Sequence, residues 1–201
     1  MGLVQTLDGH VEDVSCIISL PGDLIVSGAY TVKLWDLAAG NCLQTMSGHT
    51  TNVECVVAVP GNRVVSGACF GGHPAEMLKC WDLATGNCVQ NLTGHEYGVA
   101  SIDVFPDGRL LSTSPDNTLK IWDLSDGSCV KTLTTGLSEH ESCVLILPDG
   151  RVASGGGDGI RLWDMESFRP DPPCRGIRPG IRTGLTHFPS SNSPRWPLRN
   201  H

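Results

Sequence analysis

The dipeptide Trp-Asp occurs four times in this chain at nearly constant spacing, and no other feature limits the possible folds as strongly. Of the 201 residues, the four tryptophans concerned are Trp35, Trp81, Trp122 and Trp163. Two further markers keep the same register: a serine follows a proline by six residues in every unit, and Gly-His precedes that proline in three units. Three markers in fixed register predict a repeated supersecondary unit.

Each unit is predicted to contain four short strands. In the third unit the apolar or alternating segments are 99–105, 109–113, 118–124 and 128–133. Pro-Asp-Gly, Pro-Asp-Asn and Asp-Gly separate them, and these are turn and hairpin signals. The fold class is therefore predicted to be all-β, with about four four-stranded units.

Gly-His, Ser-Gly and Trp-Asp at a period near 40 residues resemble the WD-repeat family of β-propellers. The resemblance covers residues 3–165 and implies four-stranded blades arranged around a central channel. The propeller domain is expected over residues 1–165, with repeats at about 8–46, 47–92, 93–133 and 134–165.

The resemblance also implies a hydrogen-bonded set of His, Ser, Asp and Trp in each blade, because buried polar groups need partners. The third unit has all four residues, the first two lack a clear aspartate, and Leu137 occupies the histidine register of the fourth. The implied structural residues are His10, Ser27, Trp35, His49, Ser66, Trp81, His95, Ser112, Asp116, Trp122, Ser154, Asp158 and Trp163.

Ser, His and Asp can also form a nucleophilic triad. Here the set recurs once per unit, which favours a structural role, and we expect no enzyme activity and no catalytic residue. Cys69, His73 and Cys80 offer only three zinc ligands without a Cys-x-x-Cys pair. The glycine-rich run at 155–159 lacks the Lys-Ser/Thr of a phosphate-binding loop. We expect no metal and no cofactor.

The chain is predicted to form an open arc rather than a closed ring. Residues 3–7 have the register of Cys42–Met46 and read as a fourth strand from a preceding or closing blade. The fourth unit lacks its own last strand, so residues 3–7 could close a small ring of four blades. The alternative, favoured here because blades of this family suit a wider ring, is an arc whose open edges allow self-association.

Residues 166–201 are predicted to be a disordered tail. They contain seven prolines, six arginines and almost no apolar periodicity, and such a composition cannot support a core.

The rest of the chain is acidic within a net charge of -7, so we expect no nucleic-acid or membrane partner. Cysteines recur at repeated positions, as small buried apolar residues would. We therefore expect reduced thiols and an intracellular protein, cytoplasmic or nuclear.

Protein partners are expected on the face that carries the Gly-His segments. The second unit has an insertion there at residues 68–77, and insertions on one face of a repeat array often mark function. The candidate partner-binding residues are Tyr30, Phe70, His73, Glu76 and Tyr97. The alternative is a tolerated surface insertion.

The predicted function is a non-catalytic scaffold or adaptor for protein–protein interaction. A first alternative is a substrate- or ubiquitin-recognition module of a ubiquitin-pathway complex, suggested by the segment WDLATGNCVQNLTGH. A second is a truncated propeller paralogue with little independent function. A propeller enzyme would need a polar cluster that is not repeated, and the sequence shows none.

Overall fold

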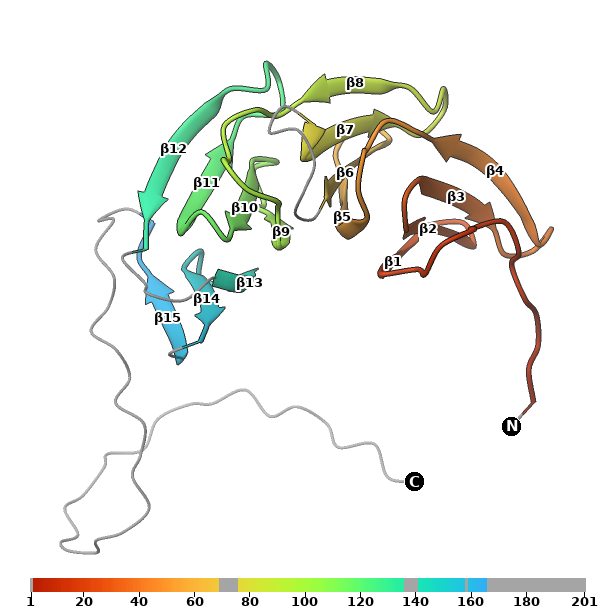
Figure 1. Cartoon of the computed structure of the whole chain (residues 1–201), viewed down its shortest axis with the longest axis horizontal. Helices are drawn as coiled ribbons and strands as arrows, with labels where there is room; N and C mark the ends of the chain where they lie inside the picture. Colours follow the sequence, from red (N-terminus) through yellow and green to blue (C-terminus); the bar gives the residue numbers. More distant parts are fainter. Residues whose placement is uncertain (1, 69–75, 136–140, 158, 166–201) are drawn as a thin grey trace, which may run out of the picture.

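Four antiparallel sheets stand side by side in an arc (Figure 1). The computed structural model describes residues 2–68, 76–135, 141–157 and 159–165. Blade 1 contains β1 (Cys16–Leu20), β2 (Leu24–Gly28), β3 (Val32–Asp36) and β4 (Asn41–Met46). Blade 2 contains β5 (Val53–Val59), β6 (Arg63–Ala68), β7 (Leu78–Asp82) and β8 (Cys88–Asn91). Blade 3 contains β9 (Ser101–Val104), β10 (Leu110–Ser114), β11 (Thr118–Trp122) and β12 (Cys129–Thr134). Blade 4 contains β13 (Glu141–Ile146), β14 (Val152–Gly156) and β15 (Gly159–Trp163).

Within each blade every strand pairs with the next one along the chain. Blades 1 to 3 have four strands and blade 4 has three, and over the described ranges no strand of one blade pairs with a strand of another. The predictions of an all-β fold and an open arc are therefore confirmed. The described residues also contain no helix that is long and apolar enough to cross a membrane.

The strand predicted at residues 3–7 does not form. Residues 2–10 belong to no strand, and Leu3 and Val4 are 86% and 98% exposed. A strand needs a neighbouring edge to satisfy its backbone groups, and this segment pairs with no strand of the described residues. The correct register was therefore not sufficient to produce a strand.

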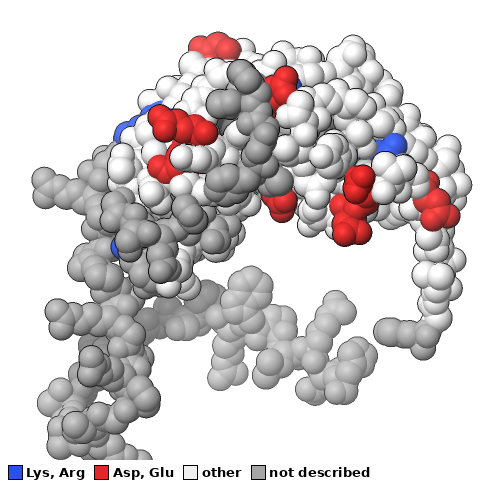
Figure 2. Space-filling view, viewed as in Figure 1, with Lys and Arg blue, Asp and Glu red and all other residues white. Residues whose placement is uncertain are grey.

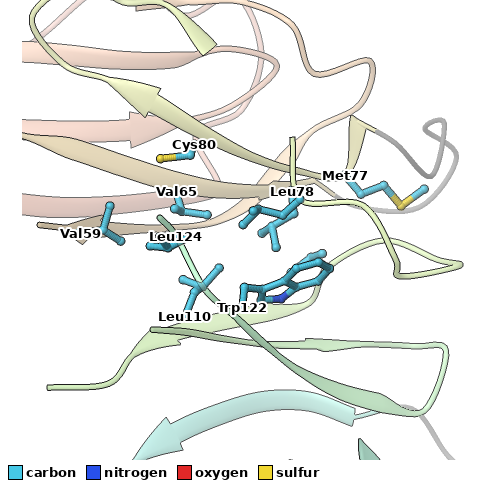
Figure 3. Packing of buried hydrophobic residues seen from close by; sticks show 10 residues of the cluster. Val59, Val65, Met77, Leu78, Cys80, Leu110, Trp122 and Leu124 are labelled. Atoms are coloured by element: carbon cyan, nitrogen blue, oxygen red, sulfur yellow. The ribbon is translucent and has the colours of Figure 1, made fainter. Parts of the chain in front are cut away.

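Apolar side chains pack between neighbouring blades in three clusters. Between blades 2 and 3, Val65 and Leu78 of the former meet Leu110 and Trp122 of the latter (Figure 3). All four side chains are almost fully buried, and burial of each large apolar side chain contributes about 1.5–3 kcal/mol. Equivalent clusters join blades 1 and 2 and blades 3 and 4. The inner blades are thus covered on both faces, and the end blades on one.

The cysteines of the outer strands are not the small buried residues that their repetition predicted. Cys88 and Cys129 are exposed and Cys42 is half-buried. Each pairs with the blade tryptophan at a β-bulge in the register of the third and fourth strands. The bulge disrupts the ladder locally on the outermost strand, where the cysteine side chain meets solvent.

Candidate functional site

Blade 3 contains a chain of four polar side chains joined by hydrogen bonds. The indole Nε1–H of Trp122 donates to Ser112 Oγ at 2.8 Å. Ser112 Oγ lies 2.7 Å from His95 Nε2, and His95 Nδ1 lies 2.8 Å from Asp116 Oδ2. Because Nδ1 faces a carboxylate, it carries the imidazole proton, and Nε2 accepts the serine hydroxyl. One donor thus meets one acceptor at every step from the tryptophan to the aspartate.

The ionisation of this set follows from its burial. Burial lowers the pKa of His95 although the hydrogen bond to Asp116 opposes that shift. Burial acts to raise the pKa of Asp116, but hydrogen bonds from His95 and Thr118 outweigh it and hold that pKa below its usual range. The pair is therefore a neutral imidazole donating to a carboxylate.

The glycine of each Gly-His dipeptide is required for a steric reason. Gly94 has a φ of 155°, and a Cβ there would lie 3.2 Å from Cη2 of Trp122. Gly48 stands in the same relation to Trp81 at 3.3 Å. A glycine accepts this backbone conformation without strain and lets the segment pack on the indole, so the histidine comes within reach of the buried serine.

Blade 2 completes the same chain without an aspartate. Trp81 Nε1 donates to Ser66 Oγ at 2.7 Å, and Ser66 Oγ lies 2.6 Å from His49 Nε2. His49 Nδ1 lies 2.7 Å from the backbone carbonyl oxygen of Glu76. A main-chain carbonyl thus replaces the missing side chain. Glu76 was predicted as a partner-binding residue, and its carbonyl is engaged inside the blade.

Blade 1 has the same series of hydrogen-bonded side chains but lacks the last group, the acceptor for the histidine Nδ1–H. Trp35 Nε1 donates to Ser27 Oγ at 2.7 Å, and His10 Nε2 lies 2.6 Å from the same oxygen. Among the residues that the structure describes, nothing accepts a hydrogen bond from His10 Nδ1. A pocket of about 150 Å³ lies here instead, lined by Gly9, His10, Val11, Glu12, Ala29, Tyr30, Thr31, Lys33 and Thr45.

Blade 4 retains the inner pair of the set. Trp163 Nε1 donates to Ser154 Oγ at 2.8 Å, and Ser154 is buried. Asp158, the predicted aspartate of this blade, lies outside the described residues. So does Leu137 in the histidine register.

The geometry of Ser112 does not suit nucleophilic attack. Its side chain is completely buried, its oxygen accepts from Trp122 and its proton is directed at His95. A nucleophile needs a free approach for the reacting carbon atom. These hydrogen bonds therefore support strand pairing and leave the serine no open side.

The described residues contain no group of three or more His, Cys, Asp or Glu side chains that could hold a metal ion. Of the three weak zinc-ligand candidates, Cys69 and His73 lie outside those residues. Cys80 is buried, and that burial raises its thiol pKa.

Sequence reasoning missed a repeated lysine on the third strand of blades 1 to 3. Lys33 Nζ donates to Thr45 at 2.7 Å, Lys79 to Asn91 at 2.8 Å and Lys120 to Thr132 at 2.9 Å. Each lysine pairs directly across from the buried serine of its blade. The signal was available, because each lysine stands two residues before the tryptophan of its Trp-Asp.

Two of the predicted partner-binding side chains are exposed on the face of the Gly-His segments. Tyr30 is 47% and Tyr97 is 49% exposed. Tyr30 lines the blade 1 pocket beside His10, and the Tyr97 carbonyl accepts from Ser114 at the β10–β11 turn. Glu76 is half-buried, and Phe70 and His73 lie outside the described residues.

The face of the arc seen in Figure 2 carries several separate acidic patches and smaller basic ones. This distribution agrees with the excess of Asp and Glu in the sequence.

Comparison with known families identifies a repeat family in this chain. The family model described as WD domain, G-beta repeat, matches residues 1–36, 40–74 and 86–123. These segments cover the first three units up to the third Trp-Asp. Comparison with curated proteins gave no match.

Proposed function

The chain belongs to the WD40 repeat family, whose repeats generally mediate protein–protein interaction, and from this premise we propose that it is a non-catalytic scaffold or adaptor. Its partners are proteins, and they bind to the face of the arc that carries the Gly-His segments. Self-association through the open ends of the arc is a further contact of the same kind.

The exposure of Tyr30 and Tyr97 on that face is the observation that supports this proposal best. The Ser-His sets of the first three blades are engaged in hydrogen bonds inside the blades, so they contribute to the framework. In contrast, the two tyrosines present about half of their surface to solvent. Tyrosine is enriched among the residues that dominate binding energy at interfaces.

Affinity purification of the full chain from cells, followed by quantitative mass spectrometry, tests the proposal. We expect the double variant Tyr30→Ser, Tyr97→Ser to lose most specific partners. Leu37→Ser with Val130→Ser is the matched control, because it removes two exposed apolar side chains elsewhere and should keep them. Equal partner lists for both variants would refute binding at this face. Ubiquitin chains among the lost partners would support the narrower function in a ubiquitin pathway.

We also infer an intracellular location, cytoplasmic or nuclear. The support is that all seven cysteines in the described segments are free thiols, as is usual in a reducing compartment. Cell fractionation and immunofluorescence test this inference, and a purely secreted protein would contradict it.

A further inference from the structure

The first three blades differ in what accepts a hydrogen bond from the histidine Nδ1–H. In blade 3, Asp116 accepts from His95 Nδ1, from the backbone N–H of Glu96 at 3.1 Å and from the N–H and hydroxyl of Thr118 at 2.9 and 2.6 Å. In blade 2 the acceptor is the Glu76 carbonyl. In blade 1 the described residues supply no acceptor.

Blade 1 nevertheless keeps the donors that Asp116 satisfies in blade 3. His10 corresponds to His95, Val11 to Glu96 and Thr31 to Thr118, and all three line the 150 Å³ pocket. The turn between the second and third strands is two residues shorter in blade 1, so it contains no counterpart of Pro115 and Asp116. The acceptor is therefore missing because the turn is shorter, and a pocket lies in its place.

The proton of His10 is directed toward this pocket. Ser27 Oγ accepts from Trp35 Nε1, so its own hydroxyl donates to His10 Nε2. A neutral imidazole that accepts at Nε2 carries its proton on Nδ1. Burial and the nearby Lys33 lower the pKa of His10, which favours this neutral form.

We propose that the blade 1 pocket binds a carboxylate, supplied by an aspartate side chain of a protein partner. This side chain would occupy the place that Asp116 occupies in blade 3 and accept from His10 Nδ1–H, Val11 N–H and the Thr31 hydroxyl. The pocket of about 150 Å³ is large enough for a carboxylate, which is a few times the size of a water molecule, because a cavity of roughly 10–15 Å³ already holds one water molecule. This inference rests on the proposed function, since it names the chemistry by which a partner is recognised.

Two charged side chains line the pocket: the cation of Lys33 favours the binding of an anion, and the carboxylate of Glu12 opposes it. Lys33 lines the pocket and uses only one of its three donors on Thr45. Glu12 lines it too, with an exposed side chain. The half-exposed ring of Tyr30 stands at the rim and offers apolar contact to the backbone beside the inserted carboxylate.

Nuclear magnetic resonance titration of the full chain with capped peptides tests the proposal. The probes are Ac-Gly-Asp-Gly-NH₂, its Asn counterpart and sodium acetate, at constant ionic strength, and the reporters are the His10 imidazole and the Val11 amide. We expect saturable shifts with the Asp peptide and about tenfold weaker binding of the Asn peptide, because charge-assisted hydrogen bonds are the stronger ones. Equal binding of both peptides would overturn the proposal. Acetate binding as tightly as the Asp peptide would contradict a protein side chain as the ligand.

Variants locate the binding. Replacing residues 29–31 with the sequence of residues 114–118 supplies the missing aspartate, so this variant should fold and should no longer respond to the Asp peptide. Lys33→Met should weaken binding several-fold, and Glu12→Gln should strengthen it. Lys120→Met is the matched control, because that lysine has the same position in blade 3, where Asp116 already occupies the place. A graft variant that binds like the unchanged chain would refute the pocket.

The two proposals can fail separately. Loss of the peptide response with partner capture intact would refute the carboxylate pocket alone. A normal peptide response, together with partner capture that does not depend on Tyr30 and Tyr97, would refute only the proposal that partners bind the face of the Gly-His segments.

Discussion

The Ser112 hydroxyl serves two neighbours at once, so its removal should cost more than one ordinary hydrogen bond. In Ser112→Ala, the Trp122 Nε1–H and His95 Nε2 lose their partner inside a fully buried site. A buried polar group left unsatisfied costs about 1–3 kcal/mol. We expect the free energy of unfolding to fall by about 2–4 kcal/mol in urea titrations followed by tryptophan fluorescence.

Ser19→Ala provides the comparison for this experiment. Ser19 lies in β1 and is exposed, and surface substitutions usually change stability by less than about 0.5 kcal/mol. If both variants changed stability equally, the buried hydrogen-bond chain would not be a source of stability.

His49 should make the fold sensitive to acid. Burial lowers the pKa of His49 from 6.5 to about 4, so between these values the unfolded chain binds a proton that the folded chain does not. Stability is therefore fully present above pH 6.5 and falls as the pH drops toward 4. The loss from this residue is about 3 kcal/mol when complete, since one pKa unit corresponds to about 1.4 kcal/mol.

Urea titrations across this pH range measure the loss, and the chemical shift of the His49 ring measures its protonation directly. The ring should stay neutral well below pH 6. A ring titration midpoint near 6.5 would show that the imidazole is not held neutral by its place between Ser66 and the Glu76 carbonyl.

The sequence predicted the side chains of the hydrogen-bonded sets but not every acceptor. The register of Gly-His, Ser and Trp-Asp identified His95, Ser112 and Trp122, which the structure brings together. It could not identify the Glu76 carbonyl, because every residue has a carbonyl and the residue type carries no signal for its use. The blade 1 pocket was equally hidden, since a missing aspartate appears in the sequence only as a shorter turn.

At the scale of the strands, alternation and turn residues placed β9 to β12 within one or two residues of the predicted ranges. They were not sufficient for residues 3–7, whose pattern suits an outer strand but whose pairing depends on a neighbouring edge. A strand forms only when two segments pair, and the sequence of one segment does not show whether a partner edge lies beside it. Cys88 and Cys129 are exposed for a similar reason, because the repetition of a residue type does not show which side of the strand faces the core.

The blades should differ in local stability according to how many neighbours cover them. Blades 2 and 3 pack on both faces, whereas blades 1 and 4 pack on one. Units that contact only their neighbours in an array gain stability from each shared interface. We expect hydrogen exchange followed by mass spectrometry to be slowest in β6 and β10, and fastest in residues 2–15 and β15. Uniform protection in all four blades would indicate a single cooperative unit instead.

At the scale of the whole molecule, successive side chains in the first strand of each blade point toward opposite neighbouring blades. This alternation identifies the apolar side chains that the two ends of the arc leave uncovered. In β5, Val56 packs toward blade 1 and Val57 toward blade 3. The residue in the register of Val56 in blade 1 is Ile17, and the residue in the register of Val57 in blade 4 is Leu145. They are 62% and 56% exposed. Each end of the arc therefore presents the kind of apolar surface that a neighbouring blade covers elsewhere.

These two ends are complementary in kind, because one is the face a blade turns to its predecessor and the other is the face it turns to its successor. A second copy can therefore cover them as a neighbouring blade would, and such heterologous contacts build either a closed ring or an extended assembly. We expect light scattering after size-exclusion chromatography to show an average mass that rises with protein concentration. Ile17→Ser with Leu145→Ser should suppress this rise, whereas Val89→Ser with Val130→Ser, which removes two half-exposed apolar side chains from the inner blades, should not. A monomer at every concentration with one sharp thermal transition would contradict association through the ends.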